Sequence, residues 1–141
     1  MTVVQPAGWS RPKGFASGLV ANGFVFVSGQ VGWDASARFA QGLVAQTRLA
    51  LENVVTVLRA AGTSPDQIVR LTWYVTDKAD YLANQRGIGA AYRETIGRHY
   101  PAMSVVEVAA LVEDAALVEI EATAVVPHPS PPPNGAGHAD D

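Results

Sequence analysis

Two glutamates near the end of the chain have the types and the spacing to carry out acid–base chemistry. Glu119 and Glu121 are one residue apart in a segment of alternating apolar and polar residues, so both would lie on the same face of a β-strand. A carboxylate that a cleft removes from water is often tuned for proton transfer. We expect this role for Glu119 and a structural role for Glu121. The alternative for Glu119 is a surface carboxylate that pairs across a boundary between subunits.

A second group of candidate residues follows an apolar run near the N-terminus. Ser28 and Gly29 form a turn whose backbone amides are able to hold an anion or a water molecule. The alternative is that this turn only redirects the chain. Trp33 and Phe39 in the next loop are interpreted either as core residues or as walls of a cleft.

Length and composition restrict the class of protein. A chain of 141 residues fits one domain, and the absence of cysteine excludes disulfides and agrees with a reducing cytoplasm. No signal peptide and no membrane-spanning run are recognised, so we expect a cytoplasmic protein. The net charge of -3 argues against a nucleic-acid partner. Charged residues make up 16% of the chain, against roughly 25% in typical soluble domains, which predicts oligomerisation.

A β-hairpin is predicted where the candidate turn begins. Two short apolar runs, residues 15–20 and 24–28, are separated by Asn22-Gly23. This dipeptide supplies the positive φ angles of a tight hairpin turn. Ser28 would therefore lie at the end of the second strand.

Two amphipathic helices are predicted after the hairpin. Apolar residues recur at helical spacing from Leu43 to Ala61, and Gly62 follows where a helix-terminating glycine is common. A second helix is expected to begin near Asp77 or Asp80, both suitable N-caps, and to run to residue 96.

Three further strands are predicted, at residues 68–76, 101–108 and 117–126. In the first, apolar residues are expected on one face: Val69, Leu71, Trp73 and Val75. The opposite face would carry the more polar residues: Arg70, Thr72, Tyr74 and Thr76. The order ββαβαββ therefore predicts an α+β fold with a mixed sheet and two helices on one face. The other sheet face needs a cover, which a closed ring of identical subunits would supply.

The C-terminal segment differs in composition from the rest of the chain. We expect a single domain over residues 1–126 and a disordered, proline-rich tail over residues 127–141. The preferred interpretation of this tail is a solvated end without function. His128 and His138 offer a metal role as the weaker alternative, and neither a metal site nor a cofactor is predicted.

Several segments, in the correct order, resemble one known family. The closing strands contain Pro101-Ala102-Met103-Ser104 and Val118-Glu119-Ile120-Glu121-Ala122, and the hairpin ends in Ser28-Gly29-Gln30. The first helix contains Ala50-Leu51-Glu52-Asn53-Val54 and ends at Ala61-Gly62. From Pro12 to Val126 the chain is similar to the YjgF/RidA (Rid) family.

This resemblance implies a fold, an assembly and an activity. Members have a chorismate-mutase-like fold, form homotrimers with clefts between subunits, and include deaminases that hydrolyse enamines and imines such as 2-aminoacrylate. In those enzymes an arginine at the position of Met103 binds the substrate carboxylate through its two-pronged guanidinium. A glutamate at the position of Glu119 handles the water. A methionine cannot bind a carboxylate in this way, so the sequence predicts a divergent member.

The resemblance also implies which residues contact the substrate. Besides Glu119 as catalytic residue, we expect contacts from a set of six residues: Phe15, Ser28, Gly29, Trp33, Arg86 and Met103. Phe15 stands where the family often has tyrosine. Arg86 and Arg70 are the candidate replacements for the missing guanidinium, and the alternative is that each is a solvated or ion-paired residue. His99 is expected to cap the end of the second helix.

Three functions follow from these expectations. The first is a hydrolase or deaminase acting on an enamine or imine metabolite, with a substrate range shifted by Met103 toward larger or less acidic molecules. The second is a non-catalytic trimer that binds a small molecule. The third is a ribonuclease or translation inhibitor, against which the acidic balance of the chain argues.

Overall fold

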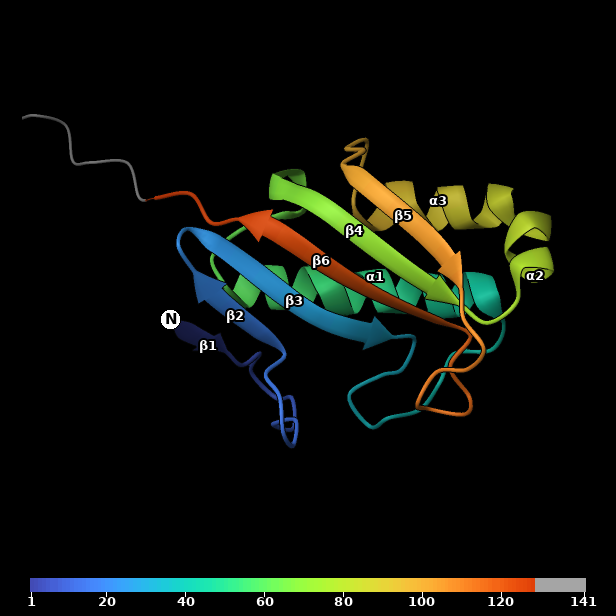
Figure 1. The fold of residues 1–141 in the computed structure, drawn as a ribbon, viewed down its shortest axis with the longest axis horizontal. Helices are drawn as coiled ribbons and strands as arrows, with labels where there is room; N and C mark the ends of the chain where they lie inside the picture. The colour runs from blue at the N-terminus through green and yellow to red at the C-terminus, as the bar shows by residue number, and fades with distance from the viewer. Residues whose placement is uncertain (129–141) are drawn as a thin grey trace, which may run out of the picture.

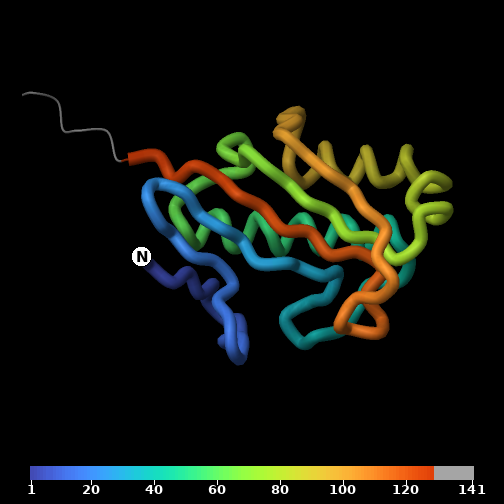
Figure 2. The backbone as a smooth tube through the Cα atoms, viewed as in Figure 1, coloured from blue at the N-terminus to red at the C-terminus, as the bar shows by residue number. Residues whose placement is uncertain are grey.

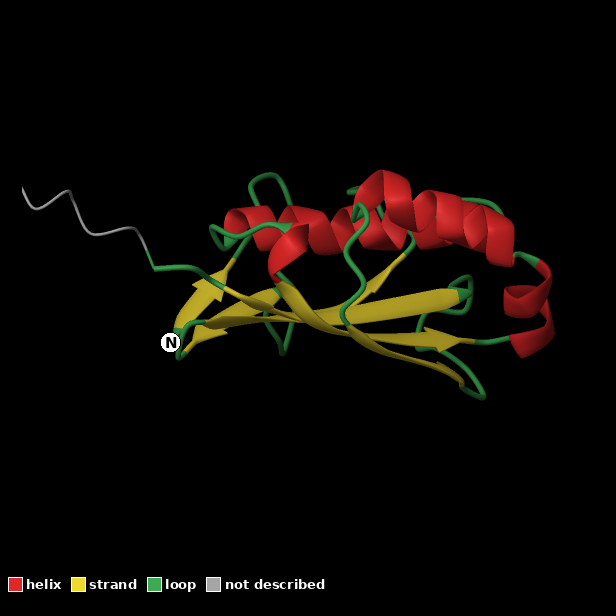
Figure 3. Cartoon of the chain, turned by 90° about the horizontal axis from the view of Figure 1, so that it is seen from above, coloured by secondary structure: helices red, strands yellow, loops and turns green. Residues whose placement is uncertain are grey.

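The computed structural model describes residues 1–128, which form a six-stranded mixed sheet with helices on one face (Figures 1 and 3). The strands lie in the order β1-β2-β3-β6-β4-β5. In chain order the elements are β1 (Thr2–Val4), β2 (Gly18–Ala21), β3 (Phe24–Val31), α1 (Leu43–Ala60), the 3-10 helix η1 (Pro65–Gln67), β4 (Ile68–Val75), α2 (Lys78–Ala83), α3 (Gln85–Thr95), β5 (Ala102–Glu107) and β6 (Val118–Val125). The predicted α+β fold is confirmed.

The hairpin and the first helix form as the sequence predicts. Asn22 and Gly23 adopt positive φ angles of 51° and 78° and join β2 to β3, with Ala21 paired to Phe24. Helix α1 ends before Gly62, which has a φ of 84°. One face of α1 packs against the sheet and is fully buried.

Strand β6 lies at the centre of the sheet and separates its two faces. It pairs antiparallel with both β3 and β4, while β5 pairs parallel with β4 at the edge. Alternate residues of β6 are buried beneath the helices: Val118, Ile120, Ala122 and Ala124. Glu119 and Glu121 lie on the opposite face, which we call the open face because no helix of the described chain covers it (Figure 3).

Three details differ from the sequence prediction. β1 was not predicted, since three residues are too few for a recognisable pattern. The expected second helix is divided at Asn84 into α2 and α3. Val69 was predicted to be buried with Leu71, but the pairing of β4 with β6 shifts there, so Ile68 is buried instead and Val69 is 41% exposed.

The loops that follow β3 and β5 lie at the same end of the sheet (Figure 2). Gln46 of α1 joins them, because its side-chain nitrogen donates to the carbonyls of Ala40 (3.1 Å) and Ala115 (2.9 Å). Its side-chain oxygen accepts from the backbone N–H of Leu117 at 2.8 Å. A buried glutamine thus holds two loops, distant in sequence, at the edge of the candidate site described next.

Candidate functional site

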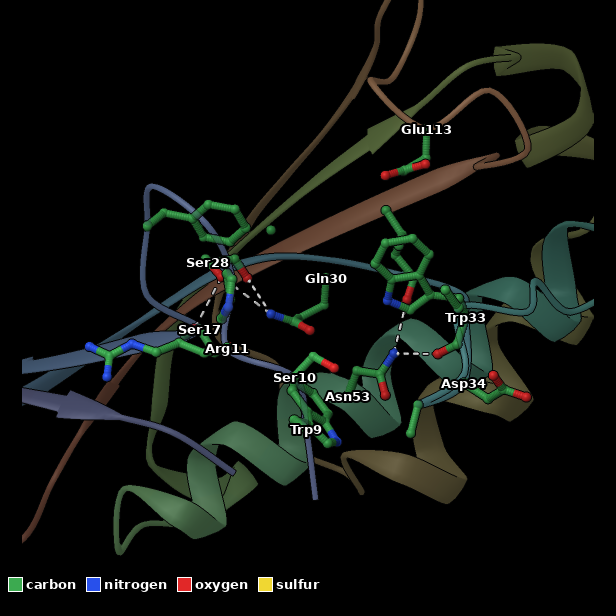
Figure 4. A pocket seen from close by; sticks show the side chains of 16 residues that line it. Trp9, Ser10, Arg11, Ser17, Ser28, Gln30, Trp33, Asp34, Asn53 and Glu113 are labelled. Carbon is green, nitrogen blue, oxygen red and sulfur yellow. Dashed lines mark hydrogen bonds between the residues drawn. The ribbon is translucent and has the colours of Figure 1, made fainter. Parts of the chain in front are cut away.

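A pocket of about 400 Å³ lies where the N-terminal segment crosses the end of β3 (Figure 4). Its walls come from residues 9–17, from β3 and the loop after it, from α1, and from the β5–β6 loop. The polar and aromatic residues that line it are Trp9, Ser10, Arg11, Phe15, Ser17, Ser28, Gln30, Trp33, Asp34, Asn53 and Glu113. Four of the predicted substrate-binding residues are therefore brought together: Phe15, Ser28, Gly29 and Trp33.

A bulge in β3 shapes one wall of this pocket. The pairing of β3 with β6 shifts between Val27 and Gln30, so Ser28 and Gly29 leave the regular ladder. Ser28 is held to Ser17, the residue before β2, because both its backbone N–H (2.9 Å) and its hydroxyl (3.1 Å) donate to the Ser17 carbonyl. The predicted turn is thus a bulge inside a longer strand.

Two buried amide side chains form the inner surface of the pocket. Gln30, 7% exposed, donates from Nε2 to the Ser28 carbonyl at 3.1 Å. Asn53, 9% exposed, donates from Nδ2 to the carbonyls of Val31 (3.0 Å) and Trp33 (2.9 Å). The Asn53 bonds attach α1 to the end of β3, and all of these bonds fix the orientation of the two amides, because a carbonyl oxygen can only accept.

Glu119 lies behind the bulge and packs directly against Gly29. A Cβ atom placed on Gly29 would lie 2.5 Å from Glu119 Oε2 and 2.7 Å from its Cδ. Burial of the carboxylate, together with the nearby negative charge of Glu121, raises the pKa of Glu119 above the ordinary 4.5. Glu121 is engaged by the Tyr74 hydroxyl, which donates to its Oε1 at 2.7 Å. Of the two candidate carboxylates, Glu119 is the one beside the pocket.

Met103 lies apart from this group in the single chain. It pairs with Leu71, whose side chain is fully buried beneath the helices, so Met103 is on the helix side of edge strand β5. Glu119 pairs with Tyr74 on the open face. Because the two residues occupy opposite faces of one sheet, a single subunit cannot bring them to the same ligand.

Neither arginine considered as a replacement for the missing guanidinium lines the pocket. Arg86 is exposed on α3. Arg70 lies on the open face, where it donates to the Ser104 hydroxyl at 3.3 Å and lines a smaller cavity of about 190 Å³ beside Glu121. Arg11, which the sequence did not single out, is the one basic residue among those that line the larger pocket in the described chain.

His99 does not cap the second helix as expected. Its Nε2 lies 2.7 Å from the carbonyl of Ile68 at the start of β4. The Tyr92 hydroxyl donates to the His99 carbonyl at 2.5 Å, and burial raises the pKa of Tyr92 to about 12, which keeps this donor protonated. The histidine thus joins α3 to the sheet.

Trp33 and Phe39 form an aromatic pair with ring centroids 5.3 Å apart. Trp33 lines the pocket, and the ring of Phe39 packs against it. Trp9, Arg11, Asn53 and Glu113 were not predicted to line a site. Their positions depend on how the N-terminal segment, the β5–β6 loop and α1 meet in the folded chain, and no local pattern in the sequence records that packing.

Two negative observations concern residues 1–128. No cluster of three or more histidine, aspartate or glutamate side chains is arranged to bind a metal ion in this range. None of the helices described there has the length and apolar character needed to cross a membrane. His128 lies in the described chain, whereas His138 and most of the predicted tail lie outside it.

The fold and the pocket define a class: a small α+β protein with a carboxylate behind the bulge of its third strand. Residues 10–126 match the family profile described as Endoribonuclease L-PSP. A 2-iminobutanoate/2-iminopropanoate deaminase from Salmonella typhimurium is 36% identical over 115 residues, which cover 79% of this chain and 86% of the relative.

Solved structures agree with this match. The crystal structure of Escherichia coli TdcF with bound serine superposes with a TM-score of 0.77 at 31% identity and covers 89% of this chain and 98% of that one. RidA from an Antarctic Psychrobacter gives a TM-score of 0.78 at 26% identity, covering 89% and 99% of the two chains. The chain belongs to the YjgF/RidA family.

Proposed function

We propose that this protein is a Rid-type deaminase that hydrolyses an imine, or the enamine from which it forms, to a carbonyl compound and ammonia. One observation carries the proposal: the Glu119 carboxylate, with a raised pKa, packs against Gly29 in the pocket wall. The name of the Salmonella relative, an iminobutanoate and iminopropanoate deaminase, supports the same reaction class.

The chemistry requires one group that both accepts and returns a proton. Water attacks the carbon of the protonated C=N bond while Glu119 removes a proton from that water, which gives a carbinolamine. Glu119 then returns the proton to the nitrogen. The C–N bond breaks as the hydroxyl gives its proton back to the Glu119 carboxylate and becomes a carbonyl, and ammonia leaves. A raised pKa makes the Glu119 carboxylate a stronger base than an ordinary glutamate, which suits the removal of a proton from water.

We further propose that the complete site forms between subunits of a homotrimer. Met103 and Glu119 lie on opposite faces of one sheet, so a neighbouring copy is needed to bring a Met103 side chain to the pocket. The open face also exposes apolar side chains that a second copy would cover: Phe24 (39% exposed), Phe26 (49%) and Val106 (43%).

The absence of a guanidinium at Met103 is expected to shift the substrate range. Methionine adds a flexible apolar surface and removes two charge-assisted hydrogen bonds to a carboxylate. Three aromatic side chains also line the pocket: Trp9, Phe15 and Trp33. We therefore expect larger or less acidic imines to be preferred over 2-iminopropanoate. Arg11, the one basic residue that lines the pocket in the described chain, is the candidate partner for any carboxylate that the substrate retains.

Two other functions remain as alternatives. A non-catalytic binder of small molecules is favoured by the missing guanidinium and by the serine bound to the TdcF relative. A ribonuclease is suggested by the family description. In the described chain the pocket is lined by one basic residue, Arg11, and by two acidic residues, Asp34 and Glu113. This balance of charge does not favour binding of the anionic phosphodiester backbone of RNA.

The test measures ammonia release from 2-iminopropanoate and from bulkier, aromatic imines generated in situ. We expect turnover with a preference for the bulkier imines, and a loss of about 100-fold or more in Glu119→Gln. Glu121→Gln is the matched control, since it removes the same charge two residues away. Tight metabolite binding without turnover of any imine would favour the binder, and RNA cleavage by the pure protein would favour the ribonuclease.

A further inference from the structure

The loop after β3 is a short hairpin that presents one indole to the pocket. Trp33 and Phe39 face each other across it in an antiparallel bridge, with ring centroids 5.3 Å apart. They are the large apolar side chains of residues 32–40, and residues 35–38 between them are exposed. Trp33 is partly buried and lines the pocket (Figure 4). An otherwise exposed loop thus places one aromatic ring in the pocket wall.

Hydrogen bonds fix this hairpin from within. The N–H of Asp34 donates to the Arg38 carbonyl, and the N–H of Ala37 donates to the Asp34 carbonyl, both at 2.9 Å. The Asp34 carboxylate accepts from the N–H groups of Ser36 (2.8 Å) and Arg38 (3.0 Å). Ala37 has a φ of 61°, a conformation that a residue other than glycine keeps only where its surroundings impose it.

Two amide side chains of α1 anchor the hairpin at its ends. Asn53 donates to the carbonyl of Trp33, the residue that carries the indole, at 2.9 Å. Gln46 donates to the Ala40 carbonyl at 3.1 Å, and the Ala40 N–H donates to the Gly32 carbonyl at 3.0 Å. The backbone that carries the indole is therefore held before a ligand arrives. A wall that needs no ordering favours binding, because less conformational freedom is lost.

The indole adjoins the part of the pocket next to the proposed catalytic carboxylate. Glu119 pairs with Val31 across the β3–β6 ladder, and residues directly opposite each other in a ladder lie on the same face of the sheet. Val31 and Gly29, which packs against Glu119, both line the pocket. Trp33 follows Val31 by two residues, so their Cα atoms are at most about 7 Å apart.

The other two aromatic side chains of the pocket are placed differently. Phe15 is 62% exposed, and Trp9 packs against the edge of the hydrophobic core. Within residues 1–128, Trp33 is the one of the three that packs against a second aromatic ring. Trp33 is therefore the ring best held in a fixed position.

We propose that Trp33 is the specificity-determining residue of this pocket and that its indole packs against a flat, aromatic side chain of the imine substrate. The inference deepens the proposed function and rests on it for the reaction at Glu119. Contact between two aromatic rings, offset or edge to face, is favourable beyond the burial of their surface. A saturated ring of the same size lacks this contribution. The protein should therefore distinguish flat from puckered side chains of equal size.

The test compares 2-imino-3-phenylpropanoate with 2-imino-3-cyclohexylpropanoate, each generated in situ by an amino-acid oxidase, and follows ammonia release above the spontaneous rate. The cyclohexyl ring is the more apolar of the two, so burial alone would favour it. We expect the wild type to prefer the phenyl imine about threefold to tenfold in kcat/KM. The difference should lie mainly in KM, because the ring contacts the protein away from the reacting atoms. Equal values, or a preference for the cyclohexyl imine, would overturn the assignment.

Two variants at one position locate the effect. Trp33→Leu keeps an apolar side chain without a flat ring and should remove the preference for the phenyl imine. Trp33→Phe restores a flat ring and should keep a preference of about twofold or more. The ratio of the two rates is measured on one sample, so a partial loss of folded protein cancels. If Trp33 only closes the hairpin, each variant changes both imines by the same factor, and that result would refute the proposal.

Binding of two unreactive acids, 3-phenylpropanoate and 3-cyclohexylpropanoate, separates this inference from the proposed reaction. Titration calorimetry with the full-length wild type should show tighter binding of the phenyl acid by about threefold or more, and tighter binding of the cyclohexyl acid would reject the role of Trp33. A preference for the phenyl acid without turnover of any imine would retain that role and reject the deaminase. Turnover of both imines without a preference would retain the deaminase and reject the role of Trp33.

Discussion

Replacing Gly29 by alanine should displace the proposed catalytic carboxylate without breaking the fold. The new methyl carbon would lie 2.5 Å from Glu119 Oε2 and 2.9 Å from its Cγ. Favourable contact between heavy atoms begins near 3.5 Å, so the Glu119 side chain must retreat by about 1 Å. The φ angle of Gly29 lies outside the left-handed region, so alanine adds no backbone strain there.

A displacement of this size predicts a large kinetic effect and a moderate effect on stability. Misplacing a reacting group by about 1 Å can reduce the rate about 100-fold, and we expect that loss in kcat for imine hydrolysis. The free energy of unfolding should fall by about 1–3 kcal/mol, the usual cost of adding a methyl group to a packed site. Ammonia release and thermal unfolding measure the two quantities.

The control for Gly29→Ala is Gly89→Ala on α3. A Cβ at Gly89 would meet only the flexible end of Arg93 at 3.3 Å, and alanine favours a helix by about 1 kcal/mol over glycine. We expect Gly89→Ala to keep the wild-type kcat. Wild-type kcat in Gly29→Ala would refute the reasoning, because Glu119 would then tolerate a displacement that the mechanism forbids.

Asn53→Ala should lower the free energy of unfolding by about 2–4 kcal/mol in urea titrations, because two buried carbonyls lose their donors; a change below 1 kcal/mol would contradict this. A raised pKa means that folding favours protonated Glu119, so the wild type loses stability as pH rises through that pKa. Glu119→Gln should therefore exceed the wild-type Tm at pH 7–8 and lose this advantage near pH 4, and the opposite order would contradict the burial argument. Met103→Arg should lower KM for 2-iminopropanoate about tenfold through a restored guanidinium, and an unchanged KM would place Met103 outside the site.

Local patterns in the sequence predicted the elements well because each pattern has a local cause. Asn22-Gly23 specifies the hairpin through its positive φ angles, and the alternation around Glu119 and Glu121 places both on one face of β6. The burial of Val69 was predicted wrongly because a bulge shifts the alternation by one residue. A bulge depends on the partner strand, which the sequence of β4 alone does not describe.

The candidate site was predicted in part for a related reason. Phe15, Ser28, Gly29 and Trp33 come from consecutive elements and lie together in the pocket. Asn53 was noticed only as part of a helix motif, although its amide joins α1 to the end of β3. Arg11 and Glu113 are brought to the pocket by loops about 100 residues apart, and such crossings follow from tertiary packing rather than from periodicity.

The central claim is that Glu119 transfers the proton in imine hydrolysis, and one comparison tests it most directly. Ammonia release from a bulky aromatic imine is measured at pH 7.5 for the wild type, Glu119→Gln and Glu121→Gln. We predict turnover by the wild type, a loss of about 100-fold or more in Glu119→Gln, and a much smaller change in Glu121→Gln. Equal rates for the wild type and Glu119→Gln would contradict the claim.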